Sequence, residues 1–132
     1  MIKQFGFTEE EYTRVRGWLL SALEIAPGPF DEAELLVKLR AEVWHLVTAD
    51  HAASVVELVR IDGELIGNVL LIGGEKGKAL REIIPAQKQF CEFLRHEGFT
   101  KLVGTPRKEF HNILKAQGFE QEHKELVKRL QL

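Results

Sequence analysis

Apolar residues in the first part of the chain recur every three or four positions, which is the spacing of an amphipathic helix. The positions are Tyr12, Val15, Trp18, Leu19, Ala22 and Leu23. Thr8 and Glu11 precede most of them as a capping box, in which each side chain bonds the backbone amide of the other residue. After a Pro-Gly-Pro sequence at 27–29, Asp31 and Glu34 repeat this signal ahead of a shorter apolar pattern. The sequence therefore predicts two helices at the start of the chain.

The period then changes to two, which is typical of β-strands. Residues 44–48 and 54–61 alternate in polarity and are rich in β-branched and aromatic side chains. Asp62-Gly63 separates the second of these segments from the apolar segment 65–72, which predicts an antiparallel hairpin. Because residues 68–72 are nearly all apolar, we expect this strand to lie centrally, with both faces covered.

From residue 79 to 97 the pattern returns to helical spacing. Pro85 lies inside this stretch, so the helix either bends there or begins with a separate short turn. A strand at 99–104, a helix over 106–117 and a last strand within 120–130 complete the expected elements. This order predicts an α/β (α+β) fold with a mixed, mostly antiparallel central sheet and helices on both faces.

Length and composition narrow the class of protein. With 132 residues, 45% of them hydrophobic and 29% charged, the chain fits one globular domain over residues 1–132. Its 18 basic and 20 acidic residues give a net charge of −2, which lacks the broad positive field that binding nucleic acid requires. No apolar run reaches the roughly 20 residues of a membrane span. We therefore expect a soluble, cytoplasmic protein that contacts neither nucleic acid nor a membrane.

The hexapeptide Gly74-Glu75-Lys76-Gly77-Lys78-Ala79 joins the central apolar strand to the following helix and is the main candidate for a binding site. A glycine-rich turn at a helix start presents free backbone amides and a partial positive charge, which together hold phosphate groups. The two lysines of the hexapeptide would add charge. The same residues also suit a plain turn in which glycines supply positive φ angles, so both interpretations stay open.

Other polar residues give weaker signals. The five histidines show no close His-His or Cys-His spacing, so we expect no metal site. His111, beside Asn112, is the histidine with the best prospect of a functional role. The single cysteine, Cys91, shares an apolar helical face with its neighbours, which predicts a small buried side chain. Glu57 alternates with apolar neighbours on its strand and is either a general base or a solvated carboxylate.

The order of these elements resembles the GNAT N-acyltransferase superfamily over nearly the whole chain. The acyl-CoA loop of that family reads Gln or Arg, two residues, Gly, one residue, then Gly or Ala. This chain matches the loop at Gly77 and Ala79 but has Gly74 at the first position. Its Leu114 to Phe119 segment is similar to the family's Tyr, three residues and Gly-Phe, with Leu114 in the place of the tyrosine that acts as general acid on the CoA thiolate.

The resemblance implies acetyl-CoA as the bound cofactor and direct transfer of its acetyl group to an amine, with Glu57 as the candidate base. The turn amides would hold the pyrophosphate, and the strand before them would offer backbone groups to the pantetheine arm. The residues concerned are Leu70, Leu71, Ile72, Gly73, Gly74, Lys76, Gly77, Lys78 and Ala79.

A second interpretation keeps the fold and drops the reaction. The short hairpin, the long helix with Pro85 and the Gly-Thr-Pro start of the next helix resemble those of small GNAT-like proteins of tailed bacteriophages. Some of these proteins are virion or accessory components. In that case its partners would be proteins of the phage particle, and its location the host cytoplasm or the virion. The missing tyrosine hydroxyl favours this interpretation.

The C-terminal third of the chain is locally basic. Its cations are Lys101, Arg107, Lys108, Lys115, Lys124, Lys128 and Arg129. Such a face is either solvated, or it holds the phosphorylated adenosine of CoA, or it docks an acidic partner. The sequence leaves these three uses open.

Overall fold

The computed structural model describes residues 1–25, 30–104, 115–116, 118–122 and 125–130. The strands are β1 (Gln4–Phe5), β2 (Trp44–Thr48), β3 (Ala52–Ile61), β4 (Glu64–Gly74), β5 (Lys101–Gly104), β6 (Glu120–Glu122) and β7 (Glu125–Arg129). The helices of the described part are α1 (Glu9–Ile25), α2 (Glu32–Arg40) and α3 (Ala79–His96).

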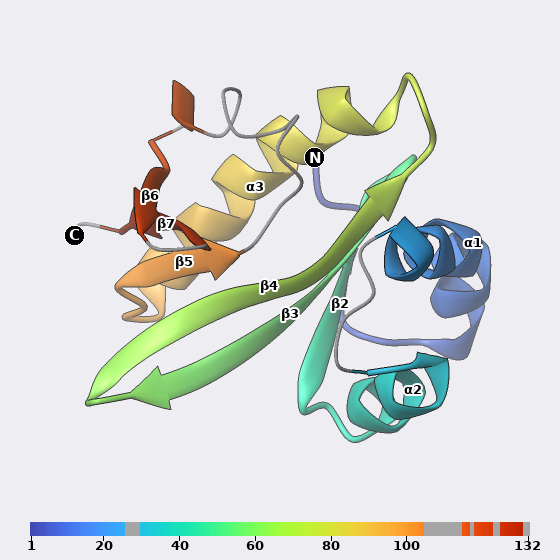
Figure 1. Ribbon diagram of the computed structural model, residues 1–132, viewed down its shortest axis with the longest axis horizontal. Helices are drawn as coiled ribbons and strands as arrows, with labels where there is room; N and C mark the ends of the chain where they lie inside the picture. Colours follow the sequence, from blue (N-terminus) through green and yellow to red (C-terminus); the bar gives the residue numbers. More distant parts are fainter. Residues whose placement is uncertain (26–29, 105–114, 117, 123–124, 131–132) are drawn as a thin grey trace.

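The strands form one sheet in the order β1-β2-β3-β4-β5-β7-β6. β4 and β5 run parallel, and the other neighbouring pairs are antiparallel. Figure 1 shows α1 and α2 beside the sheet on one side and α3 on the other. The predicted mixed, mostly antiparallel sheet with helices on both faces is therefore confirmed.

Two apolar clusters hold the layers together. One joins α1 and α2 to β2, β3 and β4, with Leu19, Leu39 and Val55 fully buried in it. The other joins α3 to the opposite face of the sheet, through Leu94, Leu102 and other buried side chains. The strand predicted to be central, β4, is the fourth of the sheet's strands in spatial order, as its apolar sequence requires.

The capping signals predicted for the first two helices are only partly right. The Glu11 amide donates to Thr8 Oγ1 at 3.1 Å, and the Glu34 amide donates to Asp31 Oδ1 at 2.9 Å. The Glu11 carboxylate, however, does not return to the Thr8 amide. It accepts hydrogen bonds from Arg14 Nε at 2.8 Å and from Thr48 Oγ1 at 2.6 Å, which ties α1 to β2.

The hairpin between β3 and β4 is confirmed. Asp62 and Gly63 have φ angles of 52° and 82°, the two positive values that a tight hairpin turn requires. α3 runs without interruption past Pro85, so this proline starts no separate turn. Cys91 is buried, as predicted.

Two strands of the structure, β1 and β6, differ from the sequence prediction. The short strand β1 has no counterpart in the sequence prediction. The final strand expected within 120–130 is present as β7, but residues 120–122 form a further strand, β6, that pairs antiparallel with it. Most of the helix expected over 106–117 lies outside the described residues, as do His111 and Leu114.

Candidate functional site

The sheet opens where β4 leaves β5. These strands pair in parallel from Ile66 opposite Lys101 to Val69 opposite Gly104. Beyond this point Leu70 has no partner among the described strands, and residues 71–74 pair only with β3 within the described part of the chain. Figure 1 shows β4 diverging from β5 toward its arrowhead. One side of β4 therefore keeps backbone groups that no described strand pairs with.

A β-bulge marks the same place. Val55 of β3 pairs with Leu71, whereas the next residue, Val56, pairs with Val69. Leu70 is thus an extra residue on β4. A bulge bends its strand and sharpens the local twist, which explains why β4 turns away from β5 here.

Close packing at the end of β4 excludes side chains from two positions. A Cβ atom on Gly73 would lie 2.4 Å from the Trp18 carbonyl oxygen of α1. One on Gly74 would lie 2.4 Å from the Ala79 Cβ and 2.6 Å from the His51 carbonyl oxygen. Gly74 is therefore required by packing, and the longer side chain usual at this motif position has no room.

The turn after β4 uses some of its backbone amides internally and leaves others free. The Glu75 amide donates to the His51 carbonyl at 2.8 Å, and the Lys78 and Ala79 amides donate to the Glu75 carbonyl at 3.0 and 2.9 Å. Lys78, the N-cap of α3, provides no side-chain cap. The backbone amides that make no hydrogen bond to another described residue are those of Lys76, Gly77, Leu80 and Arg81.

Gly77 lies at the open side of this turn. Its φ is +86°, and no atom lies within 4 Å of the position that a Cβ would take. Together with the free amides at the start of α3, this is the geometry of a helix N-terminus that accepts an anion. The expectation of free amides holds for Lys76 and Gly77 and is wrong for Glu75, Lys78 and Ala79, whose amides are bonded within the chain.

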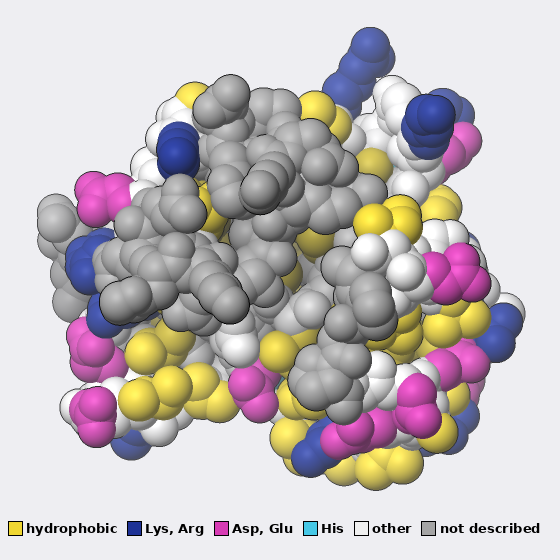
Figure 2. Space-filling view, viewed as in Figure 1, with side chains coloured by type: hydrophobic (Ala, Val, Ile, Leu, Met, Phe, Trp, Pro, Cys, Tyr) yellow, Lys and Arg dark blue, Asp and Glu magenta, His cyan; other side chains and the backbone are white. Residues whose placement is uncertain are grey.

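Charges of both signs surround the turn. Lys76, Lys78 and Arg81 are exposed, and Lys78 Nζ lies 3.6 Å from Glu75 Oε1. Figure 2 shows basic side chains with an acidic one beside them at the upper right, over the turn between β4 and α3. The cations exceed the carboxylates facing solvent here, because Glu82 in the first turn of α3 is directed at His51.

His51 lies between β2 and β3 and connects the turn after β4 to the sheet by hydrogen bonds. Its backbone amide and its ring Nδ1 both contact the Glu82 carboxylate, and its carbonyl accepts the Glu75 amide. Its Nε2 lies 3.8 Å from Glu75 Oε2. Burial raises the pKa of Glu82, but the hydrogen bonds from His51 outweigh burial, so that this pKa falls below its ordinary value. His51 and Glu82 are 31 positions apart, so no local sequence pattern could predict their contact.

Glu57 lies on β3 between Trp44 of β2 and Asn68 of β4. It points to the face covered by α1 and α2, since it alternates with Val55 of that cluster. Trp44 Nε1 donates to Glu57 Oε2 at 3.4 Å, and no ion pair with another described residue involves this carboxylate. Glu57 is half-buried and directly follows Val56, one of the two β3 residues opposite the bulge.

The only tyrosine has a structural role. Tyr12 is 4% exposed in the cluster under α1 and α2, and its hydroxyl donates to Glu32 Oε2 at 2.7 Å. Burial, followed by the hydrogen bond to Glu32, raises the pKa of Tyr12. A hydroxyl held in this way is a poor proton donor to a leaving group elsewhere.

The described residues contain neither a metal-binding cluster nor a helix able to span a membrane. No three His, Cys, Asp or Glu side chains of that part of the chain come together so as to hold a metal ion. Among the helices over the same residues, none qualifies as a bilayer-spanning segment.

Comparison with known proteins supports the fold through structure alone. No protein-family model matches the sequence, and no curated protein matches it. The solved structures that match include the ribosomal-protein-S18-alanine N-acetyltransferase of Escherichia coli, with a TM-score of 0.72 and 10% identity over 100% of this chain and 96% of that one. An acetyltransferase of Streptococcus agalactiae matches with a TM-score of 0.71 and 18% identity over 98% of each chain.

A third match is the N-acetylglutamate synthase of Neisseria gonorrhoeae, in complex with coenzyme A and N-acetyl-glutamate. Its TM-score is 0.71 at 12% identity, and the match covers 100% of this chain but only 35% of the synthase. A GNAT-family protein of Escherichia coli in complex with CoA matches with a TM-score of 0.65. These likenesses show that the chain has the fold of the GNAT N-acetyltransferases.

Proposed function

We propose that this chain binds an acyl-CoA along β4 and transfers the acyl group, acetyl in the simplest case, to an amine. The observation that carries the proposal is the continuity of two features. The side of residues 70–74 that no described strand pairs with leads directly into the amides of Lys76, Gly77, Leu80 and Arg81, which bond no other described residue. An elongated ligand with amide groups at one end and a diphosphate at the other fits this arrangement.

The residues present suit each part of acyl-CoA. Backbone groups of Leu70, Leu71, Ile72 and Gly73 would pair with the amides of the pantetheine arm, as in the addition of a strand to a sheet edge. The free amides would hold the pyrophosphate, with Lys76 and Lys78 supplying positive charge. Gly74 and Ala79 contribute by their small size, since their close approach shapes the turn.

Glu57 is the proposed base for the transfer. The amine nitrogen forms a bond to the thioester carbonyl carbon, the carbon–sulfur bond breaks, and CoA leaves as its thiolate. The amine loses one proton, which Glu57 accepts directly or through a water molecule. Because ordinary thiols have a pKa of about 8.5, a thiolate leaves near neutral pH without strict need of an acid. The position of the family's tyrosine is Leu114, so the leaving thiolate would take its proton from water.

The alternative function is a non-catalytic one, as a structural or accessory protein of a tailed bacteriophage. Leu114 favours it, because leucine has no proton to donate. The carboxylates of Glu75 and Glu82 beside the turn favour it too, since they lower the attraction for a phosphate. In this case protein partners in the particle would replace the acyl acceptor.

A thermal-shift and activity panel separates the two functions. Acetyl-CoA and CoA at millimolar concentration should raise the melting temperature, since a ligand at 100 times its Kd stabilises the native state by about 2.7 kcal/mol. Release of free thiol in the presence of a panel of primary amines then tests transfer. Stabilisation without thiol release supports a binding protein that has lost the reaction. The absence of both contradicts the proposed function.

A further inference from the structure

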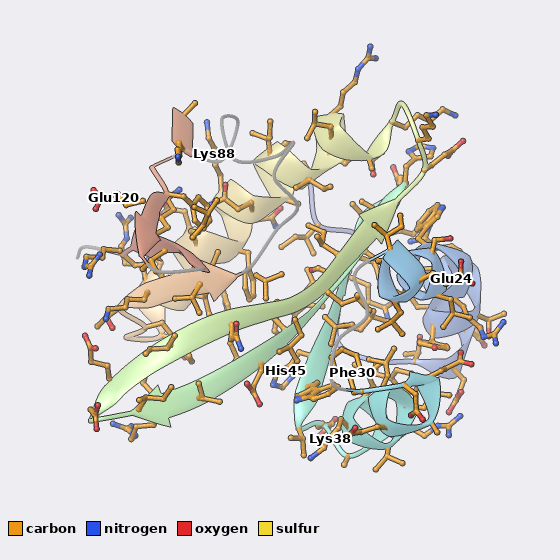
Figure 3. The ribbon with its side chains drawn as sticks, viewed as in Figure 1. Glu24, Phe30, Lys38, His45, Lys88 and Glu120 are labelled. Carbon is orange, nitrogen blue, oxygen red and sulfur yellow. The ribbon has the colours of Figure 1, made fainter. Side chains whose placement is uncertain are left out.

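A hollow of about 200 Å³ lies between α3 and β7, away from the turn that follows β4. Four basic side chains line it, Lys88 and Arg95 from α3 and Lys128 and Arg129 from β7. Figure 3 shows Lys88 on the flank of α3 that faces the C-terminal strands. Lys128 and Arg129 belong to the basic C-terminal third, whose use the sequence leaves open.

The lining of this hollow is strongly positive. Of the described residues that line it, Glu92 is the one acidic residue, and its carboxylate accepts a hydrogen bond from Arg95 Nη2 at 2.7 Å. Among the described lining residues, four cations stand against one carboxylate, in a protein whose net charge is −2. Such a local excess attracts anions even though the whole molecule is acidic.

Two of the cations are available to a ligand. Lys88 makes no ion pair or hydrogen bond with any other described residue. Lys128 Nζ lies 5.9 Å from the ring centroid of Phe119, a contact that leaves its N–H groups able to donate. Arg95 has a partner in Glu92, so its role is to add charge at the rim.

The remaining described residues of the lining are apolar. The buried Cys91 and the half-buried Leu130 complete the hollow. An apolar floor keeps water from one side of a bound anion, and electrostatic attraction is stronger where water is displaced. The hollow thus combines cations from two separate elements with a surface that excludes water.

We propose that this hollow is a binding site for a small phosphate ester, a compact and multiply charged anion. Lysine ammonium groups bind phosphate as point charges, and a guanidinium adds donors in a planar fork. The volume suits a phosphate or diphosphate group with a short organic portion. The ligand would bridge α3 and β7, so its binding should stabilise their packing.

This site is independent of the proposed acyl-CoA site. Cys91 follows Ala79 by 12 residues on the same helix, which separates them by about 18 Å at a rise of about 1.5 Å per residue. A diphosphate held at the turn therefore does not occupy the hollow. Failure of either proposal leaves the other unaffected.

Pyrophosphate is the probe that tests the site, and Cys91 is the reporter. Because Cys91 is the only cysteine of the chain, its rate of alkylation at one fixed pH reports occupancy of the hollow. The experiment uses the Gly77→Glu variant, in which the turn after β4 cannot hold the probe. We expect pyrophosphate to slow alkylation, whereas chloride at the same ionic strength should not.

Charge-reversal variants show whether pyrophosphate binds in the hollow, and calorimetry measures the affinity of each variant for pyrophosphate. Lys88→Glu and Lys128→Glu should each weaken pyrophosphate binding at least about tenfold, as loss of a charge-assisted hydrogen bond predicts. Lys115→Glu makes the same charge change at an exposed position outside the hollow and should leave binding unchanged. Circular dichroism verifies that each variant is folded. Equal protection by chloride, or equal weakening by Lys115→Glu, would overturn the proposal.

Discussion

Replacement of Gly77 by glutamate is the sharpest perturbation of the proposed acyl-CoA site. The space around this residue is open, so the new side chain meets no atom of the described protein within 4 Å of its Cβ. It does carry a negative charge into the turn in which the amides of Lys76, Leu80 and Arg81 bond no other described residue. The positive φ of +86° adds strain of about 1–2 kcal/mol for a residue other than glycine.

The loss of affinity follows from charge repulsion. Two unit charges 4 Å apart interact by about 4 kcal/mol at the effective dielectric constant of a protein surface. Salt at physiological strength screens part of this energy. We therefore expect CoA to bind Gly77→Glu at least about 100-fold more weakly than the unchanged protein, which corresponds to about 2.7 kcal/mol.

Gly63 provides a matched control at the opposite end of β4. It lies in the β3–β4 turn with a φ of +82°, and it too has no atom within 4 Å of a Cβ position. Gly63→Glu therefore imposes similar strain and the same charge at the far end of β4. Isothermal titration with CoA and thermal unfolding measure both variants. If Gly77→Glu binds CoA as tightly as Gly63→Glu does, the turn is not the phosphate site.

Three further predictions concern the reaction, the packing and the response to pH. Glu57→Gln should lower the transfer rate about 10²–10⁴-fold in a thiol-release assay without changing CoA affinity, and an unchanged rate would remove Glu57 as the base. Gly74→Ala should destabilise the protein by about 1–3 kcal/mol in urea unfolding, because its Cβ would lie 2.4 Å from that of Ala79. Gly17→Ala, in open space on α1, should instead stabilise it by about 0.5–1 kcal/mol, and equal effects of the two would contradict the packing argument. The hydrogen bond from Arg14, aided by Thr48 and opposed by burial, lowers the pKa of Glu11 from 4.5 to about 2. Since the unfolded chain then takes up this proton first, stability should be full above about pH 5 and fall between pH 5 and 2, and Glu11→Gln should flatten that fall.

The sequence predicted the features that depend on interactions between residues close together along the chain. The Thr8 cap and the Asp62-Gly63 turn each rest on residues within a few positions of one another, and both are present. β1 was missed because a strand of two residues has no periodicity. It exists through hydrogen bonds to β2, including those from the Lys3 and Gly6 amides, whose partners lie 40 or more residues away along the chain.

The candidate site was predicted only in part, for a related reason. The bulge at Leu70 lies in a run of apolar residues, and a shift of register inside such a run leaves the pattern of polarity unchanged. The contacts of His51 with Glu75 and Glu82 depend on how the sheet brings distant residues together. The glycine-rich turn was visible in the sequence, whereas the use of the Glu75 amide by His51 was not.

The most direct test of the acyl-CoA site is a titration followed by amide NMR. The account predicts that CoA shifts the amide resonances of Lys76, Gly77, Leu80 and Arg81 together with those of residues 70–73, while Gly63 stays unchanged. Shifts confined to other parts of the chain, or none at millimolar CoA, would contradict it.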